Sequence, residues 1–321
     1  MRVQRLALLG ASLAVILVWL APAVAVAQAP AAAAKTWTRP QTPDGQPDLQ
    51  GIWNYSTITP LERPGDQAGK QVLTDEEAEA LNEDARTRND RRPAEGSAGT
   101  YNAFWWDRGN SLGRTSLIVD PPDGRIPFTP EGEKRAQAGA VRGTDGPESR
   151  SLWERCVTGP GGLPRLSSGY NNNYRILQSR DYVVIYQEMI HEARVIPLDG
   201  RPHLGPNLRQ WLGDSRGRWE GQTLVVETTN FTDKTNFRGS ATALRLVERF
   251  TRTDADTIDY QFTVTDSTAW ARPWTAAFPL RKTDEPVFEY ACHETNYGLV
   301  GILSGARADE KAQEAARRGA N

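Results

Sequence analysis

Three histidines are the residues of this chain best suited to moving protons near neutral pH. They are His191, His203 and His293. Imidazole exchanges protons near pH 7, and a neighbouring carboxylate can orient its ring. Glu192 follows His191 directly, and Glu294 follows His293. We therefore take these five residues as candidates for general acid/base catalysis.

The five candidates are spread along the chain, so a site requires the fold to bring them together. Adjacent residues of a strand point to opposite faces, so His191 and Glu192 share a face only if the backbone bends there. We expect His203 or His293 to move the proton and a glutamate, for example Glu192, to orient the imidazole. Two alternatives stay open: the histidines are ordinary hydrogen-bonded surface residues, or all three bind a metal ion. No H-x-H or H-E-x-x-H spacing supports a metal, so we predict none.

Arginines and aromatic residues around the histidines are candidates for ligand binding. These candidates are Arg194, Arg201, Tyr174, Trp211, Trp219 and Trp274. The two arginines would hold an anionic group, and the tryptophans would form apolar walls. The tyrosine follows three consecutive asparagines, which add amide donors and acceptors. The competing interpretation is that these aromatic residues pack in the core or at its rim.

Two glutamates fall within predicted strands at the same parity as apolar residues. They are Glu227 and Glu248. A carboxylate on an apolar face needs a partner. We expect Arg194 or Arg249 to form an internal ion pair with one of them.

Two glycine-containing motifs do not meet the structural requirements of the sites they resemble. Residues 213–217 read G-x-S-x-G, but a nucleophile elbow needs a helix after the serine, whereas a β-branched strand follows at 223–229. We interpret this stretch as a hairpin turn with a structural Ser215. Residues 159–162 lack the context and spacing of a phosphate-binding loop. We predict no cofactor.

The chain begins with a segment that is typical of exported proteins. Arg2 and Arg5 precede an apolar run, which ends in Ala-Val-Ala at Ala27. This pattern predicts a signal peptide cleaved after Ala27, with a membrane anchor as the alternative. Cleavage would leave no stable membrane span and would place the protein in the periplasm or outside the cell.

The two cysteines fit the same compartment. Cys156 and Cys292 are predicted to form a disulfide, which an oxidising environment permits. The alternative is a reactive thiol at Cys292, beside His293. The 38 Lys and Arg nearly balance the 40 Asp and Glu. This charge excludes an electrostatic nucleic-acid binder, so the expected partner is a small-molecule ligand or substrate.

Short alternating strands in the second half predict a mainly β protein. The expected strands are 174–178, 182–189, 193–198, 223–229, 244–251, 257–265, 274–280 and 287–292. An antiparallel meander forming a barrel or a strongly curved sheet fits them best. Helices are expected at 75–91 and 130–142, and a polar one from residue 304. The expected organisation is a signal peptide at 1–27, a flexible leader at 28–47, an irregular wrapping segment with short helices at 48–170, a barrel core at 171–306 and a polar tail at 307–321.

Several stretches resemble known proteins. Gly51-Ile52-Trp53 is similar to the G-x-W opening of lipocalin-like barrels. The stretches at 120–125, 198–203, 217–231, 272–275 and 290–294 resemble a large group of exported bacterial proteins without an assigned reaction. This resemblance implies export from a Gram-negative-type cell and a common fold, and it carries over no catalytic residue.

Two functional hypotheses follow from the sequence. The first is an exported acid/base enzyme of lyase, isomerase or hydrolase type, acting on a small polar or aromatic compound in a barrel cavity. The second is a lipocalin-like carrier that binds a small molecule without catalysis. An enzyme requires at least two of the histidine and carboxylate groups within hydrogen-bond reach of each other at the cavity.

Overall fold

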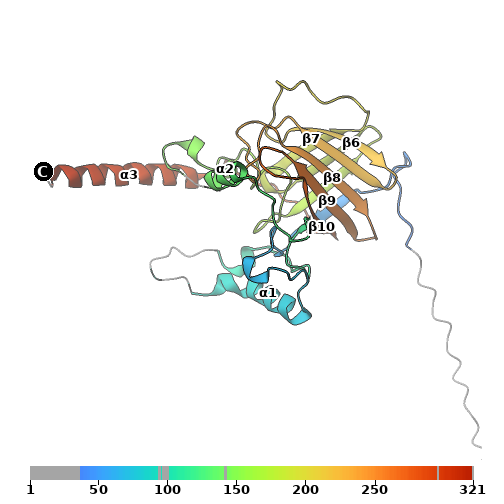
Figure 1. The fold of residues 1–321 in the computed structure, drawn as a ribbon, viewed down its shortest axis with the longest axis horizontal. Coiled ribbons are helices and arrows are strands. Elements are labelled where there is room, and N and C mark those ends of the chain that lie inside the picture. Colours follow the sequence, from blue (N-terminus) through green and yellow to red (C-terminus); the bar gives the residue numbers. More distant parts are fainter. Residues whose placement is uncertain (1–36, 93–94, 96–100, 141–142, 295, 320–321) are drawn as a thin grey trace, which may run out of the picture. The chain divides into compact units, whose positions relative to one another are not determined.

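The main element of the protein is an antiparallel sheet (Figure 1). The structure is a computed structural model that describes residues 37–92, 95, 101–140, 143–294 and 296–319. Its strands are β1 (Gly51–Asn54), β2 (Ile118–Asp120), β3 (Asn173–Gln178), β4 (Tyr182–Gln187), β5 (Glu192–Pro197), β6 (Asp214–Glu220), β7 (Thr223–Thr229), β8 (Arg245–Arg252), β9 (Thr257–Thr265) and β10 (Trp274–Thr283). The hydrogen-bonded order is β5-β4-β3-β1-β10-β9-β8-β7-β6, and β2 also pairs with β10. The mainly β prediction is confirmed.

The described residues contain three α-helices and five 3-10 turns. The α-helices are α1 (Asp75–Thr87), α2 (Pro130–Ala140) and α3 (Tyr297–Gly319), and the 3-10 turns are η1 (Gly65–Gln67), η2 (Arg88–Asp90), η3 (Ala103–Trp105), η4 (Pro147–Ser149) and η5 (Met189–His191). Thr74 and Glu77 form a capping box at the start of α1, which satisfies two backbone N–H groups. In the described part of the chain, every helix is too short or too polar to span a membrane. The predicted signal peptide lies outside the described residues.

Strand β9 shows why the second half folds as a sheet. Ile258, Tyr260, Phe262 and Val264 alternate with polar residues, and all four are fully buried. Their rings and those of neighbouring strands fill the concave side: Tyr260 packs against Phe250 and Phe278, and Phe262 against Trp274. This aromatic packing occupies much of the space in which the sequence led us to expect an apolar cavity.

The sheet curls until its two edge strands lie beside each other. A Cβ atom added at Gly217 on β6 would come within 2.7 Å of Leu198 Cδ2 and 2.8 Å of Ile196 Cγ2, and Ile196 belongs to β5. No ladder pairs β5 with β6 in the described part of the chain. The sheet is therefore a strongly curved meander, and a hydrogen-bonded closed barrel is not observed.

The front of the chain contributes more to the sheet than a wrapping segment would. Strand β1 lies between β3 and β10, and Trp53 within it is fully buried. Part of the expected flexible leader is also held: the Arg39 guanidinium donates to the Arg252 carbonyl at 2.9 Å, and the Gln46 amide donates to the Arg180 carbonyl. Local sequence composition does not predict these contacts, because they join residues far apart in the chain.

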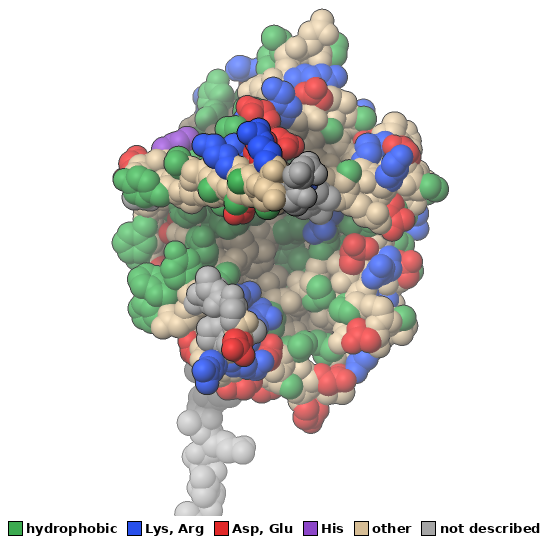
Figure 2. All heavy atoms as spheres, turned by 90° about the vertical axis from the view of Figure 1, so that its left-hand side faces the viewer, with side chains coloured by type: hydrophobic (Ala, Val, Ile, Leu, Met, Phe, Trp, Pro, Cys, Tyr) green, Lys and Arg blue, Asp and Glu red, His purple; other side chains and the backbone are tan. Residues whose placement is uncertain are grey.

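Three predicted elements differ from the structure. Residues 287–292 form no strand: the Phe288 N–H donates to the Glu188 carboxylate at 3.2 Å, and Cys292 is bonded to Cys156. Residues 213–217, expected as a hairpin turn, lie mostly within β6, which pairs along the whole of β7. Helix α3 begins at Tyr297, ahead of the expected residue 304. On the face drawn in Figure 2, acidic and basic side chains are interspersed, in keeping with the balanced composition.

Candidate functional site

A groove of about 640 Å³ lies between the first residues of β5 and β6 and the loop that precedes β6, and we call it the seam groove. It is lined by Val157, Glu192, Ala193, Arg194, Val195, Arg209, Gln210, Trp211, Leu212, Gly213, Asp214 and Ser215. Three of these residues, Glu192, Arg194 and Trp211, are among the candidates from the sequence. The lining combines apolar walls with charged and hydroxyl groups, which is the usual make-up of a small-molecule site.

The floor of the seam groove is a buried ion pair. Arg194 donates to both carboxylate oxygens of Glu248, at 2.5 and 3.1 Å, and Tyr260 donates to the same carboxylate at 2.9 Å. The Glu248 side chain is fully buried. Burial raises the pKa of Tyr260 well above its ordinary value, so the phenol keeps its proton and remains a donor. The predicted internal ion pair of Arg194 is confirmed.

Two further groups complete this floor. Arg194 also lies 3.3 Å from the Ser215 hydroxyl and 3.4 Å from the Thr228 hydroxyl. Its Nε is buried and has no partner among the described residues. A buried donor without a partner is costly, and it indicates where a water molecule or a ligand atom could bind.

Glu192 pairs with an arginine that the sequence analysis did not single out. The Arg165 guanidinium forms an ion pair with Glu192 and donates to Gln187 and to the Thr158 hydroxyl. Burial lowers the pKa of Arg165 to about 10. The suggested pairing of Glu192 with His293 is not observed, because the arginine holds this carboxylate.

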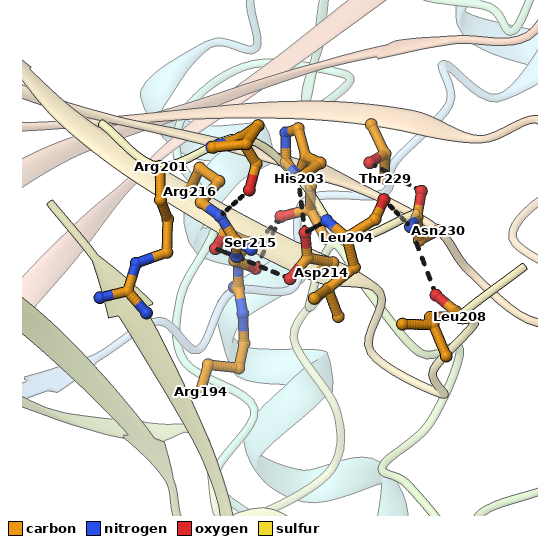
Figure 3. Close-up of polar contacts among 12 residues, drawn as sticks. Arg194, Arg201, His203, Leu204, Leu208, Asp214, Ser215, Arg216, Thr229 and Asn230 are labelled. Atoms are coloured by element: carbon orange, nitrogen blue, oxygen red, sulfur yellow. Dashed lines mark hydrogen bonds and ion pairs between the residues drawn. The ribbon is translucent and has the colours of Figure 1, made fainter. Parts of the chain in front are cut away.

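His203 and Asp214 form a hydrogen-bonded pair beside the groove. His203 Nδ1 lies 2.9 Å from an Asp214 oxygen that also accepts the Leu204 N–H at 3.0 Å, and Arg216 donates to the other oxygen at 2.6 Å (Figure 3). Burial acts to raise the pKa of Asp214, but these hydrogen bonds outweigh it and hold the pKa below its ordinary value. An ionised carboxylate at Nδ1 favours a proton there and leaves Nε2 as the basic atom.

Ser215 does not join this pair. Its hydroxyl lies 2.9 Å from Thr228 and faces the floor, whereas the carboxylate of the preceding Asp214 faces His203. Adjacent strand residues point to opposite faces, so β6 separates the hydroxyl from the imidazole. Residues 214–217 of the G-x-S-x-G stretch are therefore strand, and they place Ser215 in the floor network.

The other candidate acid/base residues lie elsewhere. His191 is exposed, and its Nδ1 lies 2.8 Å from the Tyr290 carbonyl. The backbone does bend there, since Ile190 and His191 have φ of 64° and 47°. His293 and Glu294 are exposed on the segment before α3. Within the described ranges, no group of three or more His, Cys, Asp or Glu is arranged to hold a metal ion.

The remaining ligand-binding candidates have other partners. Arg201 is exposed and pairs with Asp199, whose pKa falls to about 2 because of the guanidinium. Tyr174 is buried with its ring 4.7 Å from that of Tyr55. Trp274 is fully buried and stacks on Phe237, and Trp219 packs against the core. Their contacts are core or surface contacts, so none of these side chains reaches the seam groove.

A disulfide joins Cys156 to Cys292, as predicted, across 136 residues. It ties the segment before α3 to the loop that also contributes Val157 to the seam groove. The alternative of a reactive Cys292 thiol is wrong, because both sulfur atoms are bonded to each other.

Comparison with known proteins gives one distant similarity. No family model matches the chain, and no curated protein does. Among solved structures, a variant of the fluorescent protein UnaG is similar over 41% of this chain and 86% of its own, with 14% sequence identity and a TM-score of 0.24. A TM-score of this size establishes no shared ligand or activity. The resemblance to exported bacterial proteins stays a prediction.

Proposed function

We propose that this protein binds a small polar or aromatic molecule in the seam groove. The observation that carries the proposal is the Nε of Arg194, which no described residue contacts by a hydrogen bond, at the floor of a groove of about 640 Å³. A polar ligand atom would accept from this nitrogen or from the nearby Ser215 hydroxyl. Trp211 and Leu212 would cover the apolar part of the ligand.

Arg209 strengthens the proposal because its charge is free to meet a ligand. It donates to the carbonyls of Phe231 and Thr242, at 3.1 Å each, and forms no ion pair with a described carboxylate. Arg194 and Glu192, by contrast, are already paired. A ligand with an acidic group would therefore be drawn toward Arg209 at the edge of the groove.

The proposal is tested by screening small polar and aromatic acids for compounds that raise the melting temperature. A ligand that binds only the folded state raises it in proportion to its affinity. Trp211→Ala and Arg209→Gln should each weaken binding of a hit by about tenfold. Trp105→Ala is the matched control, since this tryptophan is 62% exposed on η3. Hits that bind both groove variants as tightly as the parent would contradict the proposal.

A second candidate function is proton transfer at His203. It is favoured by the 2.9 Å contact with Asp214, which lines the groove. His203 itself is not among the residues that line the groove, so lyase, isomerase or hydrolase chemistry would occur on a part of the bound compound that extends past Asp214, with His203 Nε2 as the base. The test is turnover of a groove ligand: His203→Gln should abolish it and leave binding intact, and turnover unaffected by this change excludes the role.

We propose in addition that the protein is exported, which the disulfide supports because thiols stay reduced in the cytosol. Intact-mass analysis of protein from the native host tests this. A mature chain beginning at Gln28 is expected, and a chain retaining residues 1–27 in the cytosol would contradict it.

A further inference from the structure

A second groove, of about 530 Å³, shares no lining residue with the seam groove and carries excess positive charge. We call it the glycine-loop groove, because one wall is residues 159–162 and the others come from the end of α2, residues 148–153 with Arg155, and residues 234–236. Its charged lining side chains are Glu148, Arg150, Arg155 and Lys234. Three cations thus face a single carboxylate in the lining.

The cations of the glycine-loop groove are only partly neutralised. Arg155 reaches Glu148 at 3.9 Å, and that carboxylate is 81% exposed, so the pair is weak. Lys234 is exposed and has no ion-pair partner among the described residues. Arg150 pairs with Glu154, yet its Nε is buried without a partner in the part of the chain that the structure describes. Unsatisfied donors and uncompensated charge favour an anion here.

The glycine loop leaves its side of the groove open. Gly161 and Gly162 have φ of 78° and 70°, a region that residues with a Cβ rarely adopt. A Cβ placed on either would meet nothing within 4 Å, so the space above the loop is empty. The loop lacks the strand and helix of a nucleotide-binding motif, but a ligand can approach its backbone closely.

We propose that the glycine-loop groove binds a small organic phosphate or sulfate ester. Guanidinium groups match tetrahedral oxyanions through paired hydrogen bonds, and a lysine adds a mobile point charge. Leu152 and Trp153 also line the groove and would cover the organic part of the ester. The disulfide of Cys156 fixes the chain directly after Arg155, which limits the entropy lost on binding.

Calorimetric titration of the full chain, with its disulfide intact, tests the proposal with three probes: phenyl phosphate, inorganic phosphate and inorganic sulfate. Phenyl phosphate should bind most tightly, because only it has a ring for Trp153. Lys234→Gln and Arg155→Gln should each weaken its binding by about fivefold, and 0.5 M NaCl should weaken it further. Arg249→Gln on β8 removes an exposed cation elsewhere and should change nothing.

Two results would overturn the proposal. One is no detectable heat or competition from phenyl phosphate at millimolar concentration and low salt. The other is binding that the Lys234→Gln, Arg155→Gln double variant retains at full strength. Melting curves of each variant establish that it is folded, and both replaced side chains reach solvent. Loss of binding in a folded double variant, with Arg249→Gln unaffected, supports the site independently of the seam groove.

Discussion

Arg194 on β5 and Glu248 on β8 form a buried ion pair at 2.5 Å, although β4, β3, β1, β10 and β9 lie between the two strands in the ladder. Such a contact is possible only because the sheet curls back on itself. The pair therefore reports on the curvature of the whole sheet, and it also forms the floor of the proposed binding groove.

Replacing one partner of this pair should be far more damaging than replacing both. Glu248→Gln leaves a buried guanidinium without its counter-charge, and we expect a loss of about 3 kcal/mol in the free energy of unfolding. The double variant with Arg194→Met and Glu248→Leu should recover most of this loss. Urea unfolding measures both, and a single-variant loss below ~0.5 kcal/mol would show that the pair is not buried in solution.

Gly217 should be intolerant of larger residues, because β5 lies against it. Gly217→Val would push into Ile196 and Leu198, and overpacking of this kind costs about 1–3 kcal/mol. Gly65→Ala, at an open position, is the control. If Gly217→Val is as stable as the parent, the two edge strands do not approach each other as described.

The disulfide should contribute strongly to stability. It closes 136 residues, and replacing both Cys156 and Cys292 with serine should cost about 2–4 kcal/mol. The same loss should follow reduction of the parent protein. Unfolding curves with and without reductant measure it, and identical curves would mean that the bond adds nothing to the folded state.

Asp214 should make the folded state sensitive to acid. Its pKa is lowered on folding, so its stabilising contribution is present above the unfolded value of about 3.9 and is lost as the pH falls through the folded pKa. Asp214→Asn should therefore reduce stability at pH 6 and have less effect at pH 3. Urea unfolding at the two pH values measures this, and an equal loss at both would assign Asp214 no titrating role.

Strands with clear alternation and strong flanking turns could be predicted from the sequence. The bounds of β7 and β9 match the expectation because apolar residues alternate there between polar turns. Strand β6 was not recognisable, since Gly217 and the surrounding arginines and acids have low strand preference. Pairing with β7 and contact with Leu198 decide its conformation, and both are tertiary effects.

In the site, too, some contacts could be predicted from the sequence and others could not. Parity within a strand was enough to predict that Glu248 needs a buried cation, and Arg194 supplies it. The partner of Glu192 could not be predicted, because Arg165 lies in irregular chain with no periodicity to mark it as buried. The pairing of His203 with the Asp214 carboxylate could not be predicted either, because Asp214 lies at the start of β6, which was not recognisable as a strand.

Fluorine NMR of protein labelled with 5-fluorotryptophan tests the seam groove most directly. Each resonance is assigned by a Trp→Phe variant, and the protein is titrated with a compound that raises its melting temperature. We expect the Trp211 resonance to shift with ligand concentration while that of Trp105 stays fixed. A ligand that shifts other tryptophans and leaves Trp211 unchanged would contradict binding in this groove.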